Sequence, residues 1–355
     1  VALGLLGEGE VEYKGERRPA GECLEAEGIT PMTLSLKEGL ALINGTQATT
    51  GLGVLALLRA ERALETAEAV AAMSMEALLG TPEAYRAEIH EARPHAGQIR
   101  SAAILRSLLE GSEIRESHRE NDPRVQDAYA LRCVPQVHGA GRHALAYIRG
   151  ILETETNSAT DNPLVFPDSD VIVSGGNFHA QIVSQALDLL TIAVADLASI
   201  SERRVERLLN PDLSMGLPAF LATQPGLESG FMIAQVTAVD LLAELRVLSH
   251  PASVDSVTTS ANQEDHVSMG LASARKARRA VGCLERVLAT ELMCAAEGIE
   301  YRRPLLGGRG VEITYGRVRA QVDRLTGDRM LGPDLDALTS AVRAGTFSGI
   351  AEELA

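Results

Sequence analysis

The segment Gln126–Gly139, QDAYALRCVPQVHG, gathers side chains that can carry out acid–base chemistry and bind anions. Because Arg132 follows Tyr129 by three residues, a helix would place both on one face. A guanidinium fork binds a carboxylate through two parallel hydrogen bonds. A phenol, with an ordinary pKa of about 10, needs such a positive neighbour to act as a base near neutral pH. The pair therefore predicts a site for a small anionic substrate.

A second polar group, Ser260–His266, immediately precedes an apolar helical pattern. Acidic residues at a helix start stabilise it by capping and by the helix dipole. Capping needs one or two such residues, whereas this segment offers six polar ones around Glu264. Capping and a functional site both remain open from composition alone.

Long apolar runs must position these groups, and they predict a mostly α protein. The runs 180–209, 227–248 and 267–297 have helical spacing, and aromatic residues make up only 3% of the chain with no Trp. Asn44-Gly45, normally a turn signal, falls inside a further helical pattern from Thr33 to about Leu79. Such a broken local rule is typical of a functional position. We find no repeat and no long linker, so we expect one long antiparallel helix bundle over residues 1–355.

Charge and composition exclude several classes of function. The 355 residues carry a formal net charge of −15, with 45% hydrophobic and 23% charged residues. This acidity opposes binding to nucleic acid, which needs a basic surface, and to anionic membranes. Asp188 and Asp196 lie within the most apolar run, so we predict a core helix there and no membrane span.

Metal and redox sites are not expected. The four cysteines lie far apart, which predicts reduced thiols. His138 and His143 are five residues apart, a spacing that places them on poorly matched helix faces for a shared metal. Gly307-Gly308-Arg309-Gly310 lacks the context of a phosphate-binding loop and is predicted to be a turn.

The chain resembles the histidine ammonia-lyases, of the aromatic amino acid ammonia-lyase family, over essentially its whole length. The matching segments are LLGEGE (5–10), ALINGTQA (41–48), RPHAGQ (93–98), QDAYALRCVPQVHG (126–139), DNPLVF (161–166), GGNFHA (175–180), SERR (201–204), LPAFL (217–221) and SANQEDHVSMG (260–270). The resemblance implies the helical fold shared with fumarases and aspartases. It also implies a cytoplasmic carbon–nitrogen lyase that converts L-histidine to trans-urocanate and ammonia, the first step of histidine degradation. The implied assembly is a homotetramer with shared active sites.

The resemblance also implies a role for each matching residue. Tyr129 corresponds to the residue that takes the β-proton, and Glu264 to the one that faces the imidazole or transfers a proton. Arg132 corresponds to the carboxylate-binding arginine, in agreement with the spacing argument above. The remaining substrate-binding positions are Asn44 (beside the electrophile), Gln126 and Phe178 (an aromatic wall).

The implied cofactor is methylidene-imidazolone (MIO), a strong electrophile that cyclises from an internal Ala-Ser-Gly; no metal is implied. No Ala-Ser-Gly occurs here, and the three Xaa-Ser-Gly sequences, at 173–175, 228–230 and 347–349, lie outside the family context. In the family the tripeptide precedes LLGEGE. We therefore expect an N-terminally truncated chain that is inactive alone.

Three alternatives remain. A phenylalanine or tyrosine ammonia-lyase, or an aminomutase, differs only in substrate or in the fate of the ammonia, and QEDHVSMG favours the histidine enzymes. A fumarase- or aspartase-type lyase would carry a Gly-Ser-Ser-x-Met-Pro-x-Lys-x-Asn loop, which this sequence lacks. A non-catalytic helical oligomerisation fragment would make Tyr129, Arg132 and Glu264 ordinary polar residues.

Overall fold

The computed structural model describes residues 1–120 and 122–354, which form two compact units. Unit 1 comprises Val1–Ala48 and Glu155–Ala180, and unit 2 comprises the other described residues. The expectation of a single helical domain over 1–355 stays a prediction.

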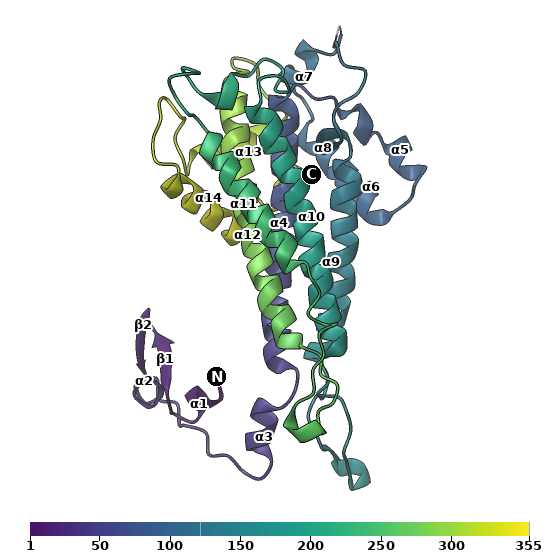
Figure 1. The fold of residues 1–355 in the computed structure, drawn as a ribbon, viewed down its shortest axis with the longest axis vertical. Helices are drawn as coiled ribbons and strands as arrows, with labels where there is room; N and C mark the ends of the chain where they lie inside the picture. Colours follow the sequence, from purple (N-terminus) through teal and green to yellow (C-terminus); the bar gives the residue numbers. More distant parts are fainter. Residues whose placement is uncertain (121, 355) are drawn as a thin grey trace. The chain divides into compact units, whose positions relative to one another are not determined.

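Unit 2 is built from long helices and is shown in Figure 1. Its principal helices are α4 (Gln47–Ala77, whose first two residues belong to unit 1), α6 (Ala96–Leu108), α9 (Val134–Thr156, whose last two belong to unit 1), α10 (Gln181–Leu209), α11 (Met232–Leu248), α12 (Gly270–Glu300), α13 (Arg309–Arg319) and α14 (Gly332–Ala344). Shorter elements connect or follow them: the 3-10 helices η1 (Pro82–Tyr85), η3 (Ala219–Leu221) and η4 (Ser260–Asn262), and the α-helices α5 (Ala87–Glu91), α7 (Glu113–Ser117), α8 (Tyr129–Arg132) and α15 (Ile350–Glu353). The predicted mostly α, long-helix fold is confirmed.

The helices of unit 2 pack in both relative directions. Ser184 bonds Ser273 near the start of α10 and α12, and Arg204 bonds Glu291 near their ends, so these two helices run parallel. α4 runs the same way, because Ser74 near its end also bonds Glu291. The helices α9 and α11 run antiparallel to these three. Buried alanines, such as Ala277 and Ala280 on α12, allow close approach of the backbones.

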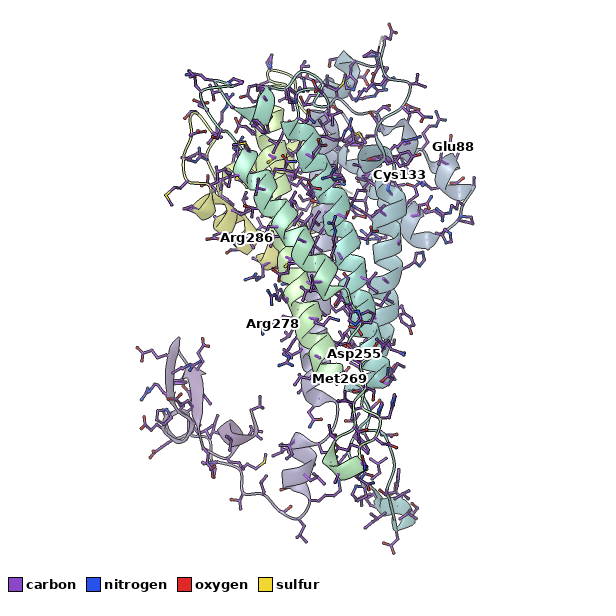
Figure 2. The ribbon with its side chains drawn as sticks, in the orientation of Figure 1. Glu88, Cys133, Asp255, Met269, Arg278 and Arg286 are labelled. Atoms are coloured by element: carbon purple, nitrogen blue, oxygen red, sulfur yellow. The ribbon has the colours of Figure 1, made fainter. Side chains whose placement is uncertain are left out.

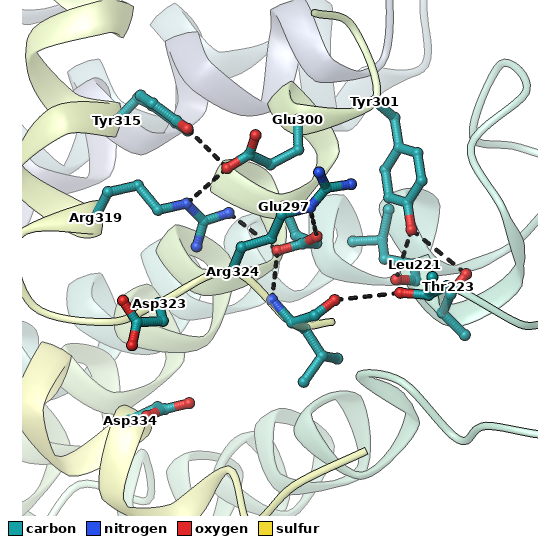
Figure 3. Close-up of polar contacts among 12 residues, drawn as sticks. Leu221, Thr223, Glu297, Glu300, Tyr301, Tyr315, Arg319, Asp323, Arg324 and Asp334 are labelled. Carbon is teal, nitrogen blue, oxygen red and sulfur yellow. Dashed lines mark hydrogen bonds and ion pairs between the residues drawn. The ribbon is translucent and has the colours of Figure 1, made fainter. Parts of the chain in front are cut away.

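Helix α12 places a fully buried glutamate every six residues, at Glu285, Glu291 and Glu297. A buried carboxylate is stable only if it is paired, and each meets arginines from neighbouring elements. Glu297 binds Arg319 of α13 and Arg324, and also accepts the Leu325 N–H at 3.2 Å (Figure 3). These contacts attach the C-terminal helices to the central bundle.

Unit 1 contains two antiparallel hairpins and short helices. Strands β1 (Glu10–Tyr13) and β2 (Glu16–Pro19) pair with Glu10 opposite Pro19, and β3 (Leu164–Phe166) pairs with β4 (Val171–Val173). The unit also holds α1 (Ala2–Leu5), α2 (Ala20–Ala26), α3 (Glu38–Ile43) and the 3-10 helix η2 (Pro167–Ser169). Lys37 forms an ion pair with Asp161, which joins the two segments of the unit.

One local prediction, the continuous helical pattern around Asn44-Gly45, was wrong in detail. Asn44-Gly45 does not interrupt one helix, since α3 ends at Ile43 and α4 begins at Gln47. Gly45 has φ +143°, which a side chain rarely adopts, so the dipeptide is an ordinary turn between helices. The charged segment that follows α6 contains the short helix α7, which buries Ile114.

Two stretches, Glu38–Ala77 and Gln181–Leu209, are long and apolar enough to cross a membrane by length and composition. The acidic residues of the second stretch therefore do not exclude a span on composition, contrary to the sequence argument. Its environment is nevertheless that of a core helix. Asp188 is buried, accepts the Ser253 N–H at 2.8 Å and binds Lys276 of α12 at 3.1 Å.

Candidate active site

Tyr129 and Arg132 lie on one face of the short helix α8, as their spacing predicts. The guanidinium carbon of Arg132 is 4.7 Å from the centre of the Tyr129 ring, a cation–π arrangement. The tyrosine side chain is 71% exposed, whereas Arg132 is half-buried. Its Nε is buried and has no hydrogen-bond partner among the described residues. The pair therefore offers a phenol and an uncommitted donor edge at the same place.

Three hydrogen bonds hold α8 and the residues just before it in position. The Tyr85 hydroxyl donates to the Leu131 carbonyl at 2.6 Å, and Arg204 donates to the Ala130 carbonyl at 3.4 Å. Just before the helix, the buried Asp127 accepts the Thr81 N–H at 2.7 Å. Side chains whose supports are locked in this way keep a defined geometry for binding and catalysis.

Arg204 is itself fixed by a fully buried ion pair. It donates to both oxygens of Glu291, at 2.5 and 2.8 Å, and the side chains of both residues are fully buried. Glu291 also accepts hydrogen bonds from the hydroxyls of Ser74 and Ser201, at 2.6 and 2.5 Å. All the donors around this carboxylate come from α4 and α10, so the support beneath α8 is tied to the centre of the bundle.

The segment after α8 contains further buried polar atoms without partners in the described chain. They are Oε1 of Gln136 and both ring nitrogens of His138. Burial lowers the pKa of His138 well below its usual value, and the charges of Arg204 and Arg142 lower it further. The imidazole is therefore neutral at physiological pH. Gln126 is exposed in the loop before α8.

Glu264 lies in the loop between α11 and α12, which is constrained by its own backbone. Thr259 and Glu264 exchange backbone hydrogen bonds of 2.9 and 3.4 Å, and the Thr259 hydroxyl donates to the Glu264 carboxylate at 2.5 Å. The hydroxyls of Thr259 and Ser260 lower the pKa of Glu264, so the exposed side chain is an anion at neutral pH. Ser260, Ala261 and Asn262 have φ of 50°, 53° and 71°. Three successive left-handed residues that are not glycine are strained, and such strain concentrates at functional sites.

Glu264 lies at the opposite end of the bundle from Tyr129 and Arg132. The loop that carries it is attached near the start of α10, where Gln181 donates to the Ser253 carbonyl at 3.1 Å. Helix α8 is attached near the end of α10, through Arg204. Arg204 follows Gln181 by 23 residues, which corresponds to about 35 Å along an α-helix. In Figure 2, Cys133, next to Arg132, and Met269, which follows the Glu264 loop, are labelled toward opposite ends of the bundle.

Asn44 and Phe178 belong to unit 1. Asn44 follows the last residue of α3 and has extended backbone angles (φ −102°, ψ 118°). A Cβ at Gly45 would lie 2.5 Å from Gln47 Oε1 and 3.1 Å from Thr160 Oγ1, so only glycine fits beside the asparagine. Phe178 follows β4 in an exposed turn and its side chain is 37% exposed. Of the six predicted site residues, the structure thus brings Tyr129 and Arg132 together and separates Glu264 from them.

The residues that support the site were not predicted from the sequence; they are Tyr85, Asp127, Arg204 and Glu291. Arg204 falls in the SERR segment that was noted, but nothing in its spacing indicates a fully buried side chain. No group of three or more His, Cys, Asp or Glu side chains suited to a metal occurs in the described ranges.

The Xaa-Ser-Gly sequences do not fit the electrophile, which needs Ala before the serine and a free glycine nitrogen for ring closure. Gly175 N–H donates to Asn162 Oδ1 at 2.8 Å, and Gly230 N–H donates to Asp328 at 2.9 Å. Gly349 N–H donates to Glu65 at 3.3 Å. Each glycine nitrogen is engaged, and none of the three sequences begins with Ala.

Comparison with known proteins agrees with this architecture. The family model "Aromatic amino acid lyase" matches residues 1–320. A histidine ammonia-lyase of Myxococcus xanthus is 52% identical over 345 residues, which are 97% of this chain and 68% of that protein. The crystal structure of histidine ammonia-lyase from Trypanosoma cruzi superposes with a TM-score of 0.90 at 46% identity, covering 99% of this chain and 67% of that one. A tyrosine aminomutase from Streptomyces globisporus has the same TM-score at 41% identity, covering 98% and 69%.

These relatives are longer than the present chain, which spans about two-thirds of their length. The family match and the identities agree with the resemblance found in the sequence motifs. This chain belongs to the aromatic amino acid lyase family.

Proposed function

We propose that this chain belongs to a histidine ammonia-lyase, which eliminates ammonia from L-histidine to give trans-urocanate. The observation that carries the proposal is the Tyr129–Arg132 pair on its buried support. The pair places a cation that can bind the carboxylate of an amino acid beside a group that can accept its β-proton. Residues around QEDHVSMG, and the relatives named above, favour histidine as the substrate.

We assign the following roles in the reaction to residues of this chain. Arg132 binds the substrate carboxylate through its uncommitted donor edge, with two charge-assisted hydrogen bonds. Tyr129 takes the β-proton, and the guanidinium over its ring stabilises the phenolate that the transfer requires. Glu264, an anion at neutral pH, accepts a hydrogen bond from the imidazole of the substrate. Gln126 adds a polar contact.

Asn44 and Phe178 complete the proposed set of site residues. Asn44 supplies an amide beside the electrophile, held by the turn that Gly45 makes possible. Phe178 supplies an aromatic wall to the substrate. These two roles rest on the positions of the residues in the motifs INGT and GGNFH.

The family is the MIO-dependent class of lyases and aminomutases. When present, MIO makes the substrate amine a better leaving group. We propose that MIO is formed from an Ala-Ser-Gly carried by a polypeptide segment other than these 355 residues. The misfit of the three Xaa-Ser-Gly sequences supports this proposal.

We further propose that the enzyme is a cytoplasmic homotetramer whose sites combine residues of several copies. Tyr129 and Glu264 lie at opposite ends of one bundle, so a site that uses both needs a second copy. Helix α11 also exposes an apolar stripe, consisting of Ile233, Val236, Val239 and Val247, whose side chains are 47–76% exposed. A stripe of this kind is typical of an interface between proteins. The number four comes from the family resemblance.

The test is production of urocanate, followed by its ultraviolet absorbance. The 355-residue chain alone should give no urocanate, and co-expression with a segment that carries Ala-Ser-Gly should give an enzyme that consumes L-histidine. Turnover by the chain alone would refute the proposed origin of the electrophile. Failure of the co-expressed, assembled protein to act on histidine would refute the proposed substrate.

A tyrosine-specific activity is the second candidate, because the tyrosine aminomutase named above matches the fold equally well. The same preparation distinguishes the two. An aminomutase would convert L-tyrosine to its β-amino acid, which chromatography separates from an unsaturated acid released with ammonia.

A further inference from the structure

A hollow in unit 2 is lined almost entirely by arginine. Its volume is about 540 Å³, and its lining consists of Arg59, Arg275, Arg278, Arg279, Gly282 and Arg343. The guanidinium groups come from three helices, α4, α12 and α14. Five cations at one place are unexpected in a chain with a net charge of −15.

One side of the hollow is held rigidly from beneath. Glu285 is fully buried and accepts hydrogen bonds from Nε and Nη2 of Arg59, at 2.8 and 2.6 Å. The same carboxylate accepts Nε of Arg343 at 3.0 Å. A shared buried carboxylate fixes the position of both guanidiniums, and each keeps further N–H groups for a ligand, because a guanidinium has five.

The other side carries positive charge that the described protein does not neutralise. Arg279 forms an ion pair with Glu244. Arg275 and Arg278 are exposed, and neither forms an ion pair or side-chain hydrogen bond within the described ranges. Figure 2 labels Arg278 on the outer side of the bundle. Five guanidiniums therefore meet two carboxylates, and the excess positive charge favours an anionic ligand.

We propose that this hollow binds a polyvalent oxyanion of the phosphate type, as inorganic phosphate or pyrophosphate or as the phosphate group of a larger metabolite. Guanidinium forks match the geometry of phosphate oxygens and bind them through paired hydrogen bonds. The volume lies within the range of about 300–1,000 Å³ that small-molecule sites have. A single carboxylate would leave most of the excess charge unbalanced, which is why a polyvalent anion fits better.

The test is calorimetric titration of the assembled protein with inorganic pyrophosphate and with orthophosphate, in chloride buffers of equal ionic strength. Saturable binding is expected, with a dissociation constant that increases with salt because the contacts are charged. The double variant R275Q/R278Q, which removes no internal ion pair, should weaken the binding by about tenfold or more. The control R17Q/R100Q removes the same charge from exposed positions outside the hollow and breaks only the exposed pair of Arg100 with Glu352, so it should bind like the wild type.

Two results would overturn the proposal. One is the absence of saturable binding of either anion. The other is binding that R275Q/R278Q and R17Q/R100Q weaken equally, since that would reflect net charge alone. The readout is binding and not turnover, so its outcome is independent of the lyase assignment.

Discussion

The guanidinium of Arg132 lies over the ring of Tyr129, with 4.7 Å between the guanidinium carbon and the ring centre. Both side chains depend on one short helix, which is held by the Tyr85 hydroxyl and by the buried Arg204. The geometry makes the two side chains a unit, but their expected kinetic effects differ, because one binds the substrate and the other moves a proton.

Replacing Arg132 should mainly weaken substrate binding. In the assembled enzyme, R132Q removes two charge-assisted hydrogen bonds to the carboxylate, so kcat/KM should fall by about 100-fold or more. R132K keeps the charge but loses the bidentate geometry. Its kcat/KM should therefore lie between those of the wild type and R132Q. Steady-state kinetics with L-histidine measures both variants. An R132Q enzyme with unchanged kcat/KM would exclude the arginine as the carboxylate ligand.

Replacing Tyr129 should mainly slow the chemical step. Y129F removes the proposed proton acceptor and should lower kcat by about 10²–10⁴-fold, the usual contribution of general acid–base catalysis. The matched control is Y147F, since Tyr147 of α9 is also exposed, at 59%. Its kcat should stay at the wild-type value. Equal effects of the two substitutions would contradict the role assigned to Tyr129.

The buried pair of Arg204 and Glu291 should dominate the stability of the bundle. E291Q leaves the Arg204 guanidinium buried without a counter-charge, and breaking a buried pair in this way costs about 3–5 kcal/mol. The control E352Q breaks the exposed pair with Arg100, where a loss of at most about 1 kcal/mol is expected. Chemical denaturation of both variants checks the difference. Similar losses would mean that Glu291 does not support the core as described.

Glu76 should make stability depend on pH. Burial raises the pKa of Glu76 to about 7, and the nearby charge of Glu312 raises it, while the Ser112 hydroxyl, the Gly308 N–H and Arg303 oppose the shift. The folded state then binds more protons than the unfolded state between about pH 4.5 and 7, so stability falls as pH rises through this window. The loss approaches about 3 kcal/mol above pH 7.

The variant E76Q should remove this dependence. Glutamine can still accept the Gly308 N–H, which Glu76 accepts at 3.1 Å, but it does not titrate. The difference in unfolding free energy between wild type and E76Q, measured from about pH 5 to 8, should therefore change steadily in favour of the variant. A difference that is constant with pH would show that Glu76 stays charged in the fold.

Much of the fold can be predicted from the spacing of apolar residues in the sequence. The apolar spacing that predicts a helix over 267–297 corresponds to α12 at Gly270–Glu300, and the run 180–209 corresponds to α10. The predicted helix boundaries are wrong where a turn dipeptide interrupts the apolar periodicity. Asn44-Gly45 separates α3 from α4 because Gly45 adopts a positive φ, which the apolar periodicity around it does not reveal.

Less of the candidate site can be predicted from residue spacing. The three-residue spacing of Tyr129 and Arg132 predicts their shared face correctly, since it depends on one helical turn. The position of Glu264 at the far end of the bundle depends on the direction of α10 and α12, which is a tertiary property. The burial of Arg204 and Glu291 likewise depends on which helices meet, and residue type alone would place both on the surface.

The central claim is that Tyr129 and Glu264 of one site come from different copies of the chain. Mixed assembly of Y129F and E264Q, each inactive alone, tests it directly in the complete enzyme. Random mixing in equal amounts should restore about a quarter of the wild-type activity, because that fraction of sites would receive both native residues. Mixtures that stay as inactive as the separate variants, despite verified co-assembly, would contradict the shared site.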